Sequence, residues 1–197
     1  MPIKEWLKDW RTEIVTIPNL LSLLRLLMIP VYVVIYLNAT EIWHYYLSAA
    51  ILALSCLTDM ADGIIARNFQ MISNVGKVLD PLADKLTQLA LILSLTARYP
   101  ALYPVLGLFL IKELFQSGAF LFFAQKGKVL PGALWAGKLC TTVLFSSLIL
   151  LVMFPRIPDN AVTVLTLVDA GFLLYSFGSY FAAYFGKETC LTDLNQN

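Results

Sequence analysis

Apolar residues fill most of the chain in long runs, which are separated by short stretches rich in proline, glycine and charge. Each run is close to the roughly 20 residues that an α-helix needs to cross the hydrocarbon core of a bilayer. The six runs are 17–38, 43–66, 76–97, 101–124, 132–154 and 161–185. Prolines such as Pro100, Pro131 and Pro155 stand at the breaks, where they favour helix ends. The pattern predicts an all-α membrane protein with six transmembrane helices.

The residues before the first run have a different pattern. On a helix, apolar side chains would share one face and basic side chains another; they are Ile3, Trp6, Leu7, Trp10 and Ile14 on the first face, and Lys4, Lys8 and Arg11 on the second. We expect residues 1–15 to form an N-terminal amphipathic helix in the membrane interface, although a leader packed on a neighbouring helix would have the same pattern. The stretch 1–14 lacks the apolar core of a signal peptide. The six-helix bundle would then span 17–185 and a tail 186–197, all within the single domain 1–197.

Composition supports a membrane protein and excludes several other classes. Of the 197 residues, 59% are hydrophobic and 14% are charged, whereas soluble domains have about 25% charged residues. The formal net charge of +1 gives no basic field that would attract nucleic acid. The three cysteines, Cys56, Cys140 and Cys190, form neither a CxxC pair nor an even disulfide framework.

The distribution of cations predicts the orientation of the chain in the membrane. Basic residues gather on alternate sides of the runs, at Lys4, Lys8, Arg11, Arg67, Lys77, Lys126, Lys128 and Lys187. The opposite links hold only Arg98 and Arg156. Because cytoplasmic loops carry the excess of Lys and Arg, we expect both termini on the cytoplasmic side of the cell's inner membrane.

Four aspartates flank the link between the second and third runs. Asp59 and Asp62 are three residues apart, and Asp80 and Asp84 are four apart, so each pair lies on one helix face. The short link makes the two helices antiparallel neighbours, which places both pairs at a similar depth near the cytoplasmic surface. Like charges that converge need neutralisation, and hard oxygen ligands favour Mg²⁺ or Mn²⁺. The sequence therefore predicts a divalent metal site.

Smaller features of the same segment fit a phosphate-bearing ligand. Gly63 and Gly76 allow a bulky group to approach the backbone, and Arg67 is placed to meet an anion such as a diphosphate. The single histidine, His44, is expected at the opposite interface rather than in this site. An ion transporter with intramembrane carboxylates is the alternative class, although we find no repeated half in the chain.

Written out, the segment 59–84 reads D-x2-D-G-x2-A-R-x8-G-x3-D-x3-D. This pattern resembles the signature of the CDP-alcohol phosphotransferases, without a gap or a substitution. The resemblance implies a six-helix membrane enzyme, generally a homodimer, that moves a phosphoryl-alcohol group from a CDP-linked donor to an alcohol acceptor and releases CMP.

The resemblance also implies roles for individual residues. Asp59, Asp62, Asp80 and Asp84 would carry two divalent ions, Mg²⁺ or Mn²⁺, and Asp84 would also be the general base. The residues that would contact the CDP moiety are Gly63, Arg67 and Ser73, together with Asn19 and Ser22 in a weaker match.

The stretches IPNLLSLLRLLMIP and GKVLDPLADK most resemble the phosphatidylglycerophosphate synthase branch of this family. The substrates of that branch are CDP-diacylglycerol and glycerol 3-phosphate. Lys112 and Lys138 are then candidates to bind the anionic acceptor, although Lys112 beside Glu113 also fits a buried ion pair that only joins helices. Two departures leave the acceptor open: Lys112 stands where this branch has arginine, and Cys140 where it has a second lysine. Phosphatidylglycerol, the acceptor of cardiolipin synthases, and another alcohol are the alternatives.

Overall fold

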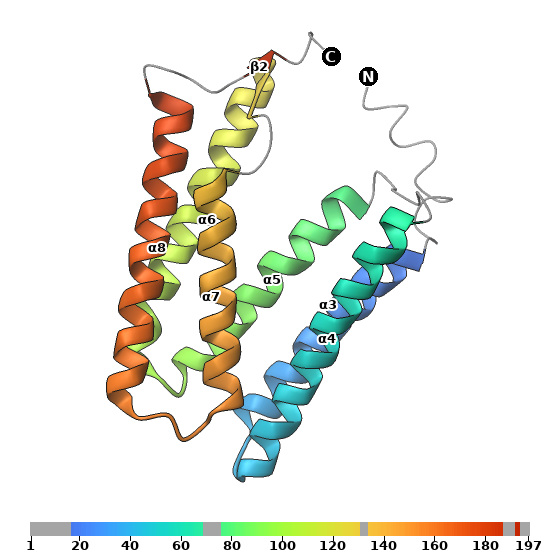
Figure 1. Cartoon of the computed structure of the whole chain (residues 1–197), viewed down its shortest axis with the longest axis vertical. Helices are drawn as coiled ribbons and strands as arrows, with labels where there is room; N and C mark the ends of the chain where they lie inside the picture. The colour runs from blue at the N-terminus through green and yellow to red at the C-terminus, as the bar shows by residue number, and fades with distance from the viewer. Residues whose placement is uncertain (1–16, 69–75, 131–133, 187–191, 194–197) are drawn as a thin grey trace. The chain divides into compact units, whose positions relative to one another are not determined.

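The computed structural model describes the backbone of residues 17–68, 76–130, 134–186 and 192–193. These residues form six long α-helices, α3 (Ile17–Leu37), α4 (Ile42–Asn68), α5 (Gly76–Thr96), α6 (Tyr103–Gln125), α7 (Trp135–Met153) and α8 (Asp159–Phe185). A short 3-10 helix, η1 (Pro100–Leu102), precedes α6. Each long helix coincides with one of the six apolar runs to within a few residues, which confirms the all-helical prediction (Figure 1). The expected helix at 1–15 lies outside the described residues.

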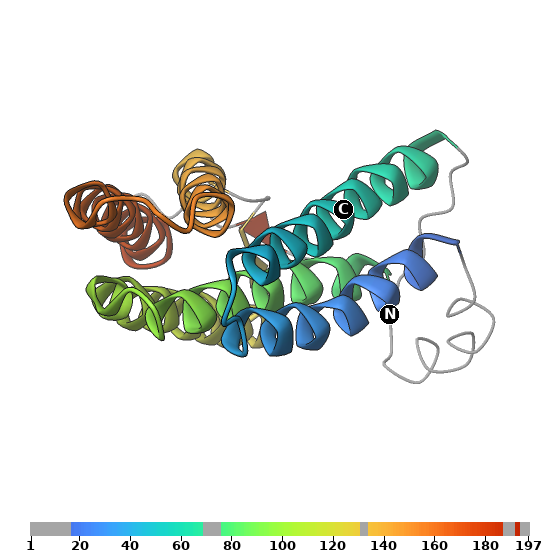
Figure 2. The same cartoon turned by 90° about the horizontal axis from the view of Figure 1, so that it is seen from below.

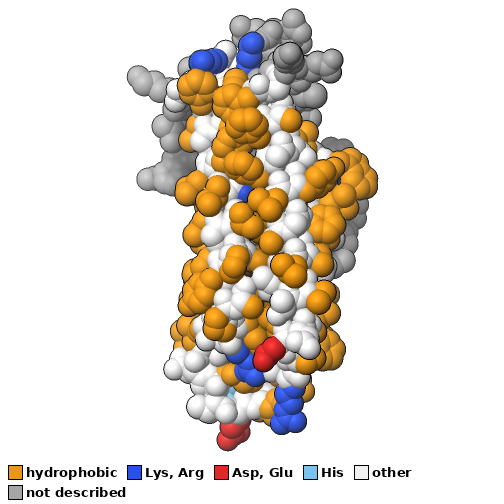
Figure 3. Space-filling model, turned by 90° about the vertical axis from the view of Figure 1, so that its left-hand side faces the viewer, with side chains coloured by type: hydrophobic (Ala, Val, Ile, Leu, Met, Phe, Trp, Pro, Cys, Tyr) orange, Lys and Arg blue, Asp and Glu red, His pale blue; other side chains and the backbone are white. Residues whose placement is uncertain are grey.

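Within the described residues, three helical segments are long and apolar enough to cross a membrane. They are Pro100–Gln125, Trp135–Met153 and Asp159–Phe185, and shorter apolar stretches cover Ser22–Leu37 and Ile42–Thr58. Figure 3 shows a face of the molecule on which hydrophobic side chains spread over most of the length, while charged side chains gather mainly near its two ends. A side chain such as Leu114, which is 72% exposed on α6, is suited to lipid. The chain is therefore a membrane protein; the count of six spans stays a prediction.

Several hydroxyl side chains on these helices form a hydrogen bond within their own helix. Ser48, Ser94, Thr141 and Ser179 each donate to the backbone carbonyl four residues earlier, at distances between 2.7 and 3.0 Å. In lipid no water would meet an orphaned hydroxyl, so a hydrogen bond within the same helix keeps such residues compatible with a membrane span.

The chain divides into two compact units, Met1–Ser94 and Leu95–Asn197. In the first unit, α3 and α4 pack against each other as an antiparallel pair (Figures 1 and 2). Tyr36 joins them, since its ring stacks on Tyr32 of α3 with centroids 5.7 Å apart and meets the edge of Tyr45 of α4 at 5.4 Å. Pro30 lies inside α3 rather than at its end, which a membrane helix tolerates.

In the second unit, α8 packs against both α6 and α7. The core consists of fully buried side chains from these helices and from η1, such as Leu102, Leu144, Leu148 and Leu173. Two short strands that the sequence did not predict, β1 (Lys128–Val129) and β2 (Thr192–Asp193), pair antiparallel, with Lys128 opposite Asp193 and Val129 opposite Thr192.

Candidate functional site

The four aspartates of the sequence pattern lie on two helix ends of the first unit. Asp59 and Asp62 fall in the last turns of α4, and Asp80 and Asp84 fall in the first turns of α5. The end of α4 and the start of α5 lie toward the same end of this unit in both ribbon views (Figures 1 and 2). The side chains of Asp59, Asp62 and Asp80 lie outside the described residues, so their convergence stays a prediction.

Asp84 is the member of this set whose side chain the structure describes, and it forms an ion pair. The Arg25 guanidinium on α3 donates from Nη1 to Asp84 Oδ1 over 2.6 Å. The Arg25 side chain is 3% exposed, whereas the Asp84 side chain is 56% exposed. Our reading of the sequence missed Arg25, although a lone cation within the apolar stretch LLSLLRLLM was a signal, because such a charge needs a partner.

Of the residues expected to contact a CDP group, the structure describes one side chain. Ser22 is fully buried on α3, one turn before Arg25. The backbone of Asn19 belongs to α3, and that of Gly63 and Arg67 belongs to α4, but their side chains lie outside the described set. Ser73 also lies outside the described residues.

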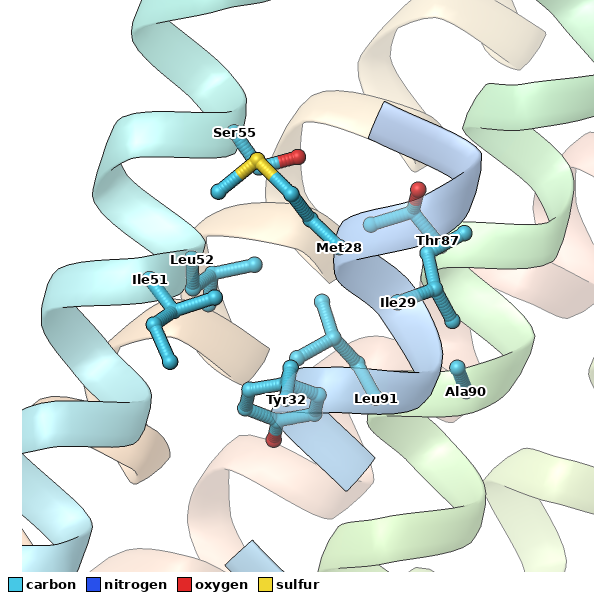
Figure 4. Close-up of a pocket in the computed structure, with 9 residues that line it drawn as sticks. All are labelled: Met28, Ile29, Tyr32, Ile51, Leu52, Ser55, Thr87, Ala90 and Leu91. Carbon is cyan, nitrogen blue, oxygen red and sulfur yellow. The ribbon is translucent and has the colours of Figure 1, made fainter. Parts of the chain in front are cut away.

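A small hollow lies between α3, α4 and α5 within the first unit (Figure 4). Its lining is mainly apolar, with the hydroxyl groups of Tyr32, Ser55 and Thr87 among the polar atoms. Ser55 precedes Asp59 by four residues on α4, and Thr87 follows Asp84 by three on α5. Four residues are about one helical turn. On each of the two helices, the hollow therefore lies about one turn further than Asp59 or Asp84 from the helix end that carries the aspartates.

The two candidate acceptor-binding lysines have different surroundings. Lys112 is buried on α6, and its Nζ lies 2.6 Å from Oε1 of Glu113. The ion pair considered from the sequence is therefore present, but it lies within α6 and does not join two helices. Lys138 is exposed in the first turns of α7. An ion-paired ammonium can still bind an anion, so Lys112 remains a candidate to bind the acceptor as well as the partner of Glu113.

Further polar groups are buried between the helices of the second unit. Asp169 of α8 is fully buried beside Ser147 of α7, yet no donor among the described residues forms a hydrogen bond of normal geometry with either carboxyl oxygen. The buried thiol of Cys140 lies within electrostatic range of both Lys112 and Asp169. Our reading of the sequence also missed Asp169, although a carboxylate inside the apolar run LTLVDAGFLL is a signal of a functional residue.

His44 lies where the sequence placed it, away from the acidic residues. It belongs to the first turn of α4, while Asp59 and Asp62 belong to the last turns, and its Nδ1 accepts a hydrogen bond from the Glu41 amide over 3.4 Å. His44 therefore contributes to the start of the helix.

The chemistry of the acidic residues fits a hard divalent cation. Within the described part of the chain, no three carboxylate, histidine or cysteine groups gather at one point, but that part includes only the Asp84 side chain of the four. Two helix ends that each carry a pair of carboxylates supply the oxygen donors that Mg²⁺ and Mn²⁺ prefer. The Asp84 carboxylate also pairs with the Arg25 guanidinium, so a metal ion at this position would share the carboxylate with Arg25.

The fold and the site together define a class: this is a helical membrane protein with a pair of acidic residues at each of two helix ends. A family model, CDP-alcohol phosphatidyltransferase, matches residues 15–175. The chain therefore belongs to the CDP-alcohol phosphatidyltransferase family, and it is a transferase rather than the transporter that its carboxylates also permitted.

Three similar curated proteins carry the same name. A protein of Pseudomonas fluorescens is 29% identical over 167 residues, which cover 82% of this chain and 83% of the relative. A protein of Escherichia coli strain K12 is 31% identical over 172 residues, with 85% and 93% covered, and one of Salmonella paratyphi A is 31% identical over 171 residues with the same coverage. All three are called CDP-diacylglycerol--glycerol-3-phosphate 3-phosphatidyltransferase.

Proposed function

We propose that this protein transfers a phosphatidyl group from CDP-diacylglycerol to glycerol 3-phosphate and releases CMP. The observation that supports the proposal most is the complete pattern D-x2-D-G-x2-A-R-x8-G-x3-D-x3-D between Asp59 and Asp84. It lies in a chain whose relatives are named for this reaction. The product would be phosphatidylglycerophosphate, a phospholipid precursor.

In this proposal the four aspartates of α4 and α5 hold two divalent ions, Mg²⁺ or Mn²⁺. When bound, these ions offset the negative charge of the donor's diphosphate and of the departing CMP. The Asp84 carboxylate accepts the proton of the acceptor hydroxyl, whose oxygen attacks the β-phosphorus of the donor. The bond between that phosphorus and the bridging oxygen breaks, and CMP leaves with the bonding electrons.

The remaining site residues bind the two substrates. Gly63, Arg67 and Ser73, with Asn19 and Ser22 on α3, would contact the CDP group, since glycine allows close approach and guanidinium pairs with phosphate oxygens. Lys112 and Lys138 would bind the phosphate of the acceptor. The buried position of Lys112 supports this role, because a cation shielded from water attracts an anion more strongly.

The wider arrangement in the membrane is also part of the proposal. We infer six spans in a single domain, an interfacial helix at 1–15, and both termini on the cytoplasmic side of the inner membrane together with the active site. The apolar helices and the distribution of Lys and Arg support this arrangement. We further propose a homodimer in membrane lipid, as the family resemblance implies, with no nucleic-acid partner.

The reaction can be tested with purified protein in mixed micelles. CDP-diacylglycerol is supplied with glycerol 3-phosphate or with phosphatidylglycerol, and CMP release and the lipid product are followed with Mg²⁺ or Mn²⁺ present. We expect phosphatidylglycerophosphate from the first mixture only. Product from phosphatidylglycerol alone would instead assign cardiolipin synthesis, an alternative that Cys140 favours because it replaces an expected cation.

A further inference from the structure

Arg25 is a charged residue in an apolar helix, and its side chain is almost fully buried. It lies in α3 between leucines, and 3% of its side chain is exposed. A buried guanidinium is unfavourable unless it is paired and hydrogen-bonded, so a chain retains one where it serves a partner. One such partner is Asp84, which lies 59 residues further along on α5.

The ion pair between Arg25 and Asp84 is asymmetric in its burial. The guanidinium reaches the carboxylate from inside the first unit, with 2.6 Å between Nη1 and Oδ1, while the Asp84 side chain is 56% exposed. Burial removes the Arg25 guanidinium from water while the Asp84 carboxylate keeps contact with it, so the desolvation cost of the pair falls mainly on Arg25. The Asp84 side chain is more than half exposed, so a ligand can still reach its carboxylate.

We propose that Arg25 is a positioning residue, whose guanidinium fixes the Asp84 carboxylate and offsets part of the charge of the aspartates on α4 and α5. The inference rests on the proposed function of Asp84 as general base and metal ligand. Arg25 itself touches neither substrate nor metal in this scheme; it acts through Asp84.

Two opposite effects follow from this role, and they separate it from a purely structural one. Orientation of a reacting group by a fixed hydrogen bond accelerates the chemical step, so loss of Arg25 lowers kcat. The guanidinium also repels other cations near Asp84, so the same loss leaves the cluster more negative and strengthens its attraction for a divalent ion. A merely structural arginine would weaken metal binding and thermal stability together.

The test compares the full-length wild type with Arg25→Gln and Arg25→Lys in detergent. Mn²⁺ binding without substrate is measured from the electron paramagnetic resonance signal of the free ion, and kcat and KM from CMP release. For Arg25→Gln we expect kcat at least tenfold lower, the donor KM within about threefold of wild type, and a Mn²⁺ dissociation constant equal to or up to tenfold below wild type. Arg25→Lys keeps the charge without the planar fork, so its Mn²⁺ affinity should match wild type and its kcat should lie between the other two.

Arg98→Gln is the matched control. Arg98 is buried in part, and its Nη2 donates to the Pro155 carbonyl over 2.6 Å within the second unit, so the same substitution there removes a guanidinium that does not contact Asp84. We expect unchanged Mn²⁺ binding and kcat for this variant.

Either of two results would overturn the role of Arg25: an unchanged kcat in Arg25→Gln, or Mn²⁺ affinity that falls together with the melting temperature. The proposed function fails separately, since in that case the wild type itself would release no CMP from CDP-diacylglycerol.

Discussion

Asp84 has two roles to reconcile, because it pairs with Arg25 and is also the candidate general base. The ion pair restricts the carboxylate to one orientation, and 56% of the side chain remains exposed to a ligand. The sequence predicted Asp84 from its place in a repeated acidic spacing. It did not predict Arg25, because a contact between residues 59 positions apart depends on how α3 packs against α5.

Replacement of Asp84 by asparagine tests the base directly. Asp84→Asn keeps the shape of the side chain but cannot accept a proton, so we expect kcat to fall about 10²- to 10⁴-fold, while the donor KM changes little. CMP release measures both. Asp159→Asn, at the exposed start of α8, is the control and should retain full activity; near-full activity of Asp84→Asn would exclude the role of base.

Substitutions at Lys112 and Glu113 can separate two roles of Lys112, a structural ion pair and binding of the acceptor. Lys112→Met leaves a largely buried carboxylate without its ammonium, which should destabilise the protein by about 3 kcal/mol. The double variant Lys112→Met/Glu113→Gln removes both charges, so the melting temperature should recover. If Lys112 also binds the acceptor, the KM for glycerol 3-phosphate stays at least tenfold raised in the double variant; full recovery of KM would leave only the structural role.

At the scale of helices, α7 and α8 approach each other closely at Gly137. A Cβ added at Gly137 would lie 2.6 Å from the hydroxyl oxygen of Tyr180, whose side chain is 4% exposed. Small residues allow such contacts between membrane helices, where packing rather than the hydrophobic effect favours association. Tyr180 also belongs to a core cluster with Ala119 and Tyr184, so it has little space into which it can move.

Gly137→Ala should therefore lower the melting temperature clearly, by an amount equivalent to about 1–3 kcal/mol of overpacking. Tyr180→Phe removes the nearest atom, so combining the two substitutions should recover part of the loss. Gly118→Ala on α6 is the matched control, since no atom lies within 4 Å of its added Cβ, and there the better helix propensity of alanine should leave the protein as stable or more so. Equal effects at both glycines would contradict the close contact.

The helices themselves were predictable from the sequence, and the contacts between them were not. The bilayer fixes a length for each apolar run, so the bounds of α3 to α8 follow from hydropathy and proline placement. Pro30 and Pro81 do not mark helix ends, because a membrane helix can satisfy the backbone group that a proline leaves without its partner. The pairing of Lys128 with Asp193 joins segments that no periodicity relates.

At the scale of the whole molecule, each of the two compact units contains one group of candidate residues. The acidic residues and Arg25 belong to Met1–Ser94, and both candidate acceptor lysines belong to Leu95–Asn197. If the reaction is as proposed, substrates bound by these two groups must meet during turnover. The prediction of a single domain, 1–197, therefore implies that both units act in the same reaction.

The inferred orientation predicts which links a reagent can reach from each side. After the native cysteines are replaced by alanine, Gly127→Cys and Arg156→Cys are introduced singly, one at each end of α7. In sealed inside-out vesicles, a membrane-impermeant maleimide should label position 127 and spare 156, and intact spheroplasts should give the reverse. Labelling of both positions from one side would contradict a span at α7.

The short pairing of β2 with β1 has a practical consequence for anyone who purifies or images this protein. Because Thr192 and Asp193 pair with Val129 and Lys128, only the four residues 194–197 separate this strand pair from an affinity tag or fluorophore fused after Asn197. A bulky fusion would crowd the turn at Gly127, whose φ is 73°. A spacer after Asn197 is the sensible precaution in any expression vector.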